Sequence, residues 1–229
     1  MAEDPSKPTK GDYLHGMVKG GLSLVPGVGG AAAEVFGLLV KTPAAKRMET
    51  FLVRLSDELE RIGVVVQDLS TREDVVSVAI QATQAAFRTH DEGKLEALKN
   101  AVLNAALGKV DSPELTSYFI GLVDTLTPLH LAILEFLENP RAYDQPSVAG
   151  SRYRTIPSSV SDVLERALPD LAGKREIYDV IGKDLYLRGL SNTDGFHTMM
   201  TEEGTKARRT SPVGQAFLRF IQSPQAGKS

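Results

Sequence analysis

Apolar residues recur along the middle of this chain at steps of three and four, with polar residues between them. This spacing puts the apolar side chains on one face of an α-helix. It predicts an all-α domain of four or five helices over residues 43–138, where nothing reads as a strand. The defining positions are Met48, Phe51, Leu52, Leu55 and Leu59, then Val75, Ala79, Ala82 and Ala86, then Leu95, Leu98 and Val102, then Phe119, Leu122 and Val123, and finally Ile133, Leu134 and Leu137.

Start and stop signals bound these helices. Thr42-Pro43, Ser112-Pro113 and Thr127-Pro128 each combine a capping residue with a proline at the first helical position. Another helix is expected to start near Asp91. Gly63 and Gly108 follow the last periodic residues of two helices, so they are expected to end them.

The helical periodicity disappears over residues 139–157, where prolines and glycine punctuate a polar stretch, which predicts a linker. Beyond it, Ser158-Ser159 caps a short helix, and a second helix runs from Arg175 to Arg188 before Gly189. The second helix carries Ile177, Val180, Ile181, Leu185 and Leu187. Residues 196–201 and 205–210 predict a β-hairpin that turns at Gly204, and a final helix begins at Ser211-Pro212.

The order of helices, hairpin and closing helix resembles a winged helix-turn-helix domain. The predicted fold is therefore mainly α, with an N-terminal helical bundle that includes a glycine-rich helical hairpin and a small α+β winged-helix-like domain after it. The expected division is a disordered tail at 1–12, a helical domain at 13–138, the linker at 139–157, the winged-helix-like domain at 158–223 and a disordered tail at 224–229.

Residues 16–40 form an apolar, glycine-dense segment that Pro26-Gly27 breaks into two arms. Gly16 and Gly20 stand four apart before the break, and Gly29, Ala33 and Gly37 stand four apart after it. On a helix, this spacing makes a smooth groove that a second helix can approach closely. We favour a hairpin packed against the protein core. Insertion into a membrane or an oligomer is the second hypothesis, and a phosphate-binding loop is the least favoured because a P-loop ending is missing.

Composition narrows the function classes. The chain has 229 residues, of which 42% are hydrophobic and 24% charged, and it has no cysteine. Disulfides, thiol nucleophiles and thiolate metal sites are therefore excluded, and a cytoplasmic location, with peripheral membrane binding as an option, is expected. The polar N-terminal residues do not read as a secretory signal. From Arg152 onward, 12 basic and 9 acidic residues give a positive end, whereas the first 151 residues hold 14 and 20.

No catalytic, cofactor or metal site is predicted. His90 and Asn100 belong to a polar cluster that could border a hydrolase pocket, although a solvated helix face explains it equally well. His130 lacks histidine or carboxylate partners three or four residues away, so a buried, hydrogen-bonded side chain is preferred over a metal ligand. His15 and His197 stand alone in the same way, and no Gly-x-Ser-x-Gly pattern occurs.

Basic residues of the C-terminal part are the candidates for nucleic-acid or partner binding. Glu176, Asp179 and Asp184 share the helix with several of them and would oppose phosphate approach, so a protein-interaction or dimerisation module is favoured over a DNA-binding one. The candidates are Lys174, Arg175, Lys183 and Arg188 on the helix and Lys206, Arg208 and Arg209 on the wing.

Pro-Gly-Val-Gly-Gly at 26–30, Ala45-Lys46-Arg47, the helical domain and Thr-Ser-Pro-Val-Gly at 210–214 follow one another in this order. The chain in this respect resembles a group of uncharacterised bacterial proteins and is loosely similar to the Abi-alpha (abortive infection alpha) family. The resemblance implies a role in phage defence, in which the infected cell stops growing. The leading hypothesis is a non-enzymatic defence or stress effector, whose candidate partners are a second copy, a membrane surface or a protein. A winged-helix DNA-binding regulator is the alternative, and a hydrolase is the third.

Overall fold

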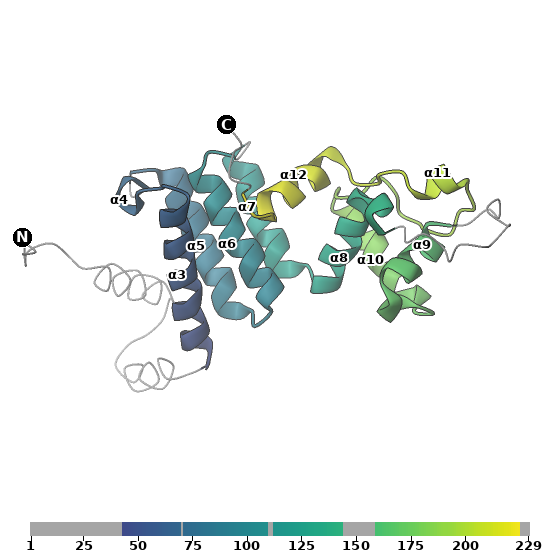
Figure 1. Cartoon of the computed structure of the whole chain (residues 1–229), viewed down its shortest axis with the longest axis horizontal. Helices are drawn as coiled ribbons and strands as arrows, with labels where there is room; N and C mark the ends of the chain where they lie inside the picture. The colour runs from purple at the N-terminus through teal and green to yellow at the C-terminus, as the bar shows by residue number, and fades with distance from the viewer. Residues whose placement is uncertain (1–42, 70, 110–111, 144–158, 225–229) are drawn as a thin grey trace, which may run out of the picture. The chain divides into compact units, whose positions relative to one another are not determined.

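The computed structural model of the chain describes residues 43–69, 71–109, 112–143 and 159–224, and this part is built from helices (Figure 1). The predicted mainly α class is confirmed. Contacts divide the described residues into two compact units, one made of 43–125 with 220–224 and the other of 126–219. The glycine-rich segment 16–40, with Gly16, Gly20, Gly29, Ala33 and Gly37, lies outside the described residues, so its role stays a prediction.

The first unit is a helical bundle in which α5 and α6 are central. Figure 1 shows α3, α5, α6 and α7 side by side, and α5 packs against each of the other three. Ala101, Val102 and Leu103 on α6 are at most 1% exposed, so this helix forms the middle of the core. The helices are α3 (Pro43–Arg61), α4 (Val66–Leu69), α5 (Glu73–Arg88), α6 (Glu92–Ala106) and α7 (Pro113–Thr125).

Glycines end three of the helices, as the sequence predicts. Gly63, Gly108 and Gly189 have φ of +77°, +69° and +72°, in the left-handed region that glycine adopts without a steric cost. At each one the chain makes a Schellman motif; after α10, for example, Leu190 N–H donates to Leu185 O at 2.9 Å. The left-handed residue satisfies the last carbonyls of the helix and sends the chain off in a new direction.

The second unit consists of shorter helices around a core that includes Tyr178, Leu185 and Phe196, each at most 2% exposed. Helix α10 packs against α8 and η2, and α9 packs against α8 and both 3-10 helices. The elements are α8 (Pro128–Glu138), η1 (Pro140–Tyr143), α9 (Val160–Ala167), η2 (Pro169–Leu171), α10 (Arg175–Leu187), α11 (Glu202–Thr205) and the first part of α12 (Pro212–Ile221).

The predicted β-hairpin is wrong. Residues Glu202–Thr205 form the short helix α11, and the described residues contain one isolated β-bridge, between Ser191 and Thr210, and no strand. Thr201 caps α11 because its Oγ1 accepts a hydrogen bond from Gly204 N–H at 3.1 Å. Gly204 lacks the positive φ that a tight hairpin turn needs. A winged-helix domain with a β part is therefore not supported in the described chain.

The compact units differ from the predicted division at α8. We expected α8 to close the first domain, but it packs against α9, α10 and η1 and belongs to the second unit. The unit boundary falls between Thr125 and Leu126, at the Thr127-Pro128 restart, where the sequence predicts a new helix but not a new unit. Residues Pro140–Tyr143, expected to open the linker, form η1, and residues 144–157 lie outside the described residues.

Candidate functional site

Helix α10 turns a set of large apolar side chains toward solvent. Ile177, Val180 and Leu187 are 48%, 69% and 72% exposed, and they lie on one side of the helix together with the exposed charges Glu176 and Lys183. We call these five residues the α10 face. Single exposed apolar residues are ordinary on protein surfaces, whereas several on one side of a helix make that side a candidate interaction site.

The opposite side of α10 explains why these residues face outward. Tyr178, Ile181 and Leu185 are buried at three- and four-residue steps, and Gly182 lies among them. A Cβ at Gly182 would sit 2.5 Å from Cζ of Phe196, so the aromatic ring occupies the space that a side chain there would need. This close approach fixes the rotation of the helix and leaves the α10 face without a place in the core of its own unit.

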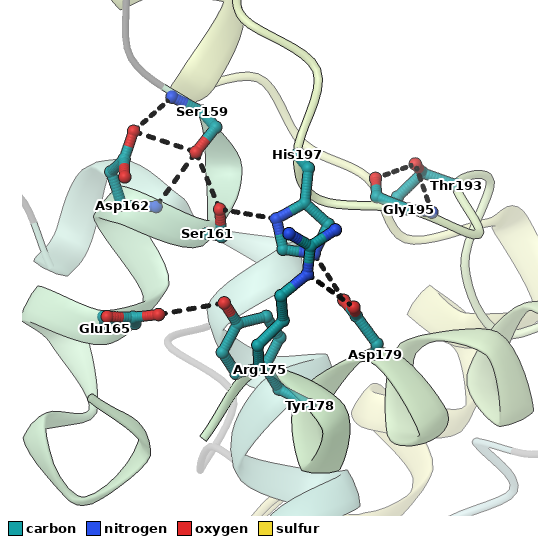
Figure 2. A network of polar contacts seen from close by, with 10 residues as sticks. All are labelled: Ser159, Ser161, Asp162, Glu165, Arg175, Tyr178, Asp179, Thr193, Gly195 and His197. Carbon is teal, nitrogen blue, oxygen red and sulfur yellow. Dashed lines mark hydrogen bonds and ion pairs between the residues drawn. The ribbon is translucent and has the colours of Figure 1, made fainter. Parts of the chain in front are cut away.

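A polar network at the N-terminus of α9 lies beside α10 (Figure 2). Ser159 caps α9 through a capping box: its N–H donates to Asp162 Oδ2 at 2.6 Å, and its Oγ accepts from Asp162 N–H at 3.3 Å. Hydrogen bonds from the backbone and hydroxyl of Ser159 hold the pKa of Asp162 below its usual value. The cap presents the next serine, Ser161, toward His197.

His197 joins this network to α10, as Figure 2 shows. Its Nδ1 lies 3.2 Å from Ser161 Oγ, and its Nε2 lies 2.7 Å from Asp179 Oδ1. The ring also lies against Tyr178, with centroids 5.8 Å apart. Among the described residues His197 has no hydrogen-bond partner three or four residues away in the sequence, as predicted, but the fold brings it together with two polar residues that are far apart from it in the chain. No local sequence pattern links them.

Serine, histidine and aspartate in this order suggest nucleophilic catalysis, but the surroundings favour an anchor. Ser161 is buried, and its Oγ lies 2.7 Å from the Oγ of Ser159. Its N–H donates to Phe196 O at 2.9 Å, so this amide is not available to stabilise an oxyanion. We interpret the network as a clamp that holds the N-terminal half of α10 to α9 and to the His197 loop.

Tyr178 strengthens the clamp from inside the unit. Its hydroxyl donates to Glu165 Oε1 at 2.9 Å, as Figure 2 shows. Burial, followed by the hydrogen bond to Glu165 and its negative charge, raises the pKa of Tyr178 to about 12. Burial disfavours the phenolate through loss of hydration, and the negative charge of Glu165 disfavours it through repulsion.

We expect Tyr178 to ionise well above the usual pKa of a phenol. A spectrophotometric titration at alkaline pH should show one of the six phenols titrating near pH 12. Since the pKa is raised in the folded state, this tyrosine favours folding below pH 10 and loses that contribution between pH 10 and 12. Tyr178→Phe should remove the late step. An unchanged titration curve in the variant would show that Tyr178 is not held as described.

The C-terminal half of α10 has its own anchor at Asp184. This carboxylate accepts a hydrogen bond from Arg188 Nε at 2.7 Å and lies 3.3 Å from His130 Nε2 on α8. His130 also completes the capping box of α8 with Thr127, so its ring is hydrogen-bonded, as predicted. Asp179 and Asp184 therefore fix α10 at two points and leave the α10 face turned outward.

Most of the basic side chains predicted to bind a nucleic acid or a partner already form ion pairs or hydrogen bonds within the second unit. Arg209 donates to the carbonyls of Gly204 and Ala207, both at 2.6 Å, and its burial lowers its pKa. Lys174 and Lys183 are exposed and form no ion pair with any other described residue. The remaining four pair with carboxylates: Arg175 with Asp179, Arg188 with Asp184, Lys206 with Glu202 and Arg208 with Glu138.

The polar residues considered for a hydrolase site, His90 and Asn100, do not face a common pocket. His90 is exposed, whereas Asn100 is buried and donates to Ile221 O at 3.0 Å. Asn104 donates to Phe220 O at 2.8 Å and to Gln222 O at 2.9 Å. These two amides hold the C-terminal end of α12, where helix carbonyls lack partners of their own. Among the described residues no group of three or more histidine or carboxylate side chains is placed to bind a metal.

A cleft of about 310 Å³ lies between α3 and α6 in the first unit. Lys46, Arg47 and Arg54 of α3 line this cleft. Arg54 pairs with Glu92 at 3.2 Å, and Lys99 pairs with Glu96 at 2.8 Å. The lining therefore presents both signs of charge, and we assign no ligand to it.

The comparisons with known proteins add no relative. No family model, no curated protein and no solved structure matches the chain. Within the described residues, no helix combines the length and the hydrophobicity that crossing a bilayer requires.

Proposed function

We propose that this chain is a non-enzymatic effector that acts by binding another protein chain through the α10 face. The observation that carries the proposal is the exposure of Ile177, Val180 and Leu187 on one side of a single anchored helix. Protein-binding surfaces typically have an apolar centre and a charged rim. Here the apolar residues provide the centre, and Glu176 and Lys183 provide the rim.

The anchors support this proposal because they preorganise the surface. Asp179 is held by His197, and Asp184 is held by Arg188 and His130, so α10 has little freedom to lose when a partner binds. The same ion pairs weaken the DNA-binding alternative. Arg175 and Arg188 are already paired with carboxylates on their own helix, which opposes contact with phosphates.

The biological setting in the proposal comes from the resemblance to the Abi-alpha family. We propose that the protein works in the cytoplasm and that partner binding is the step that stops growth of an infected cell. In this scheme the segment 16–40 is the candidate for contact with a membrane surface or with other copies.

A photo-reactive residue placed at position 180 tests the binding surface. We expect benzoylphenylalanine at 180, in the full chain and in living cells, to form a protein adduct on illumination, because a bound partner lies within reach of this position. The matched control is position 53, where Val53 is 40% exposed on α3 and belongs to no apolar group of this kind. Equal adduct yields at 180 and 53, or no adduct at either, would contradict the proposal.

A further inference from the structure

We propose that the partner of the α10 face is a second copy of this chain, bound with the two α10 helices antiparallel. This inference rests on the proposed function, since it names the partner of the same surface. Ile177, Val180 and Leu187 are spaced by three and seven residues, which places them along one stripe of the helix. Ile177 and Val180 are 48% and 69% exposed, and both lie in the N-terminal half of the helix.

The charges on the α10 face specify the direction of pairing. Glu176 and Lys183 are seven residues apart, so they lie on the same side of the stripe, one before and one after Val180. A twofold axis level with the midpoint between Asp179 and Val180 brings the two Val180 side chains together, with Ile177 of each copy beside them. The same axis sets each Glu176 opposite Lys183 of the second copy, which gives two ion pairs. In a parallel arrangement Glu176 would lie about 10 Å along the helix axis from Lys183 of the second copy, so neither ion pair would form.

The charged groups that would pair across the dimer have no ion-pair partner elsewhere in the described structure. Glu176 and Lys183 are both exposed and form no ion pair with another described residue, whereas Arg175, Asp179, Asp184 and Arg188 on the same helix are all paired. The stripe is short, so the buried area falls at the low end for specific complexes. The expected dimer is accordingly weak, with a dissociation constant of micromolar order.

Charge exchange between the two positions tests the inference by sedimentation of the full chain over a range of concentrations. Glu176→Lys and Lys183→Glu each replace two attractive pairs with two repulsive ones and should weaken self-association about 10- to 30-fold. A mixture of these two single variants should form a heterodimer, because each lysine then meets a glutamate. The double variant Glu176→Lys with Lys183→Glu should dimerise like the original chain.

Val180→Asp is the matched test of the apolar centre. Val180 is 69% exposed, so the substitution should leave the urea midpoint of unfolding unchanged while it abolishes the dimer. Monomers at every concentration, or self-association that is insensitive to all of these substitutions, would overturn the self-pairing inference.

The mass of the adduct formed from position 180 separates the two proposals. An adduct of twice the chain mass of 24.7 kDa supports self-pairing. An adduct with a different protein keeps the proposed function and overturns the self-pairing. No adduct above the level of position 53 would overturn both.

Discussion

Gly214→Ala is expected to destabilise the second unit by about 3 kcal/mol, because overpacking against a fixed backbone cannot be relieved by a side-chain rotation. A Cβ at position 214 would lie 2.0 Å from the backbone O of Leu190. That carbonyl accepts the N–H of Ser211 at 3.0 Å, and Ser191 beside it forms the bridge to Thr210. The added methyl group must therefore push apart the segment after α10 and the start of α12.

Gly121→Ala is the matched control for this substitution. Gly121 is exposed within α7, and a Cβ there would meet nothing within 4 Å. Alanine has the higher helix propensity, so the control should gain about 0.5–1 kcal/mol of stability. Urea unfolding followed by circular dichroism measures both variants. A loss below about 1 kcal/mol for Gly214→Ala would mean that α12 does not approach Leu190 as closely as described.

Asn104→Ala is expected to lower the free energy of unfolding of the first unit by about 2–3 kcal/mol. The Asn104 side chain is 3% exposed, and its amide donates to Phe220 O at 2.8 Å and Gln222 O at 2.9 Å. Both carbonyls belong to the C-terminal end of α12, which no further helical turn can satisfy. Alanine would leave them unpaired and would release residues 220–224 from α6.

Asn192→Ala provides the control, since Asn192 is exposed and its backbone N–H bond to Arg209 O survives the change. We expect an effect within about 0.5 kcal/mol for this surface substitution. Hydrogen exchange of the last turn of α12 should rise in Asn104→Ala only. If the two variants unfolded at the same urea concentration, Asn104 would not be the residue that holds this end of the chain.

Local signals in the sequence are sufficient to predict most helices. Asp91 caps α6 by accepting the N–H of Lys94 at 2.8 Å, and Ser112 caps α7 by accepting the N–H of Leu115 at 3.1 Å. Both interactions occur within four residues, so their residue types at that spacing reveal them. The same holds for Gly63 and the other helix-ending glycines, because the left-handed backbone is a property of a single residue.

The α10 face and its clamp depend on contacts that the sequence pattern does not encode. Ile177, Val180 and Leu187 look like core residues by periodicity, yet packing of Gly182 on Phe196 rotates them outward. The buried residues Tyr178, Ile181 and Leu185 follow an equally good helical spacing, so periodicity alone does not tell which of the two sets is buried. Two overlapping apolar patterns on one helix therefore leave open which of the two faces the core.

The hairpin error has a related cause. Phe196–Thr201 and Thr205–Thr210 contain threonines and large side chains that suit strands, but a strand needs a partner along its whole length. In the described structure, polar side chains of these two segments instead form hydrogen bonds with nearby backbone carbonyls. The hydroxyl of Thr205 donates to Glu202 O at 2.7 Å, and the guanidinium of Arg209 donates to Gly204 O at 2.6 Å. These bonds close a helical turn where a hairpin was expected.

The most direct test of the account measures adduct formation from benzoylphenylalanine at position 180, with and without Ile177→Asp and Leu187→Asp in the same chain. Both side chains are exposed, so the urea midpoint should stay unchanged. We predict that the two aspartates lower the adduct yield to that of position 53, since they place charges in the centre of the binding surface. An adduct yield at 180 that the aspartates leave unchanged would contradict the claim that the α10 face binds a protein.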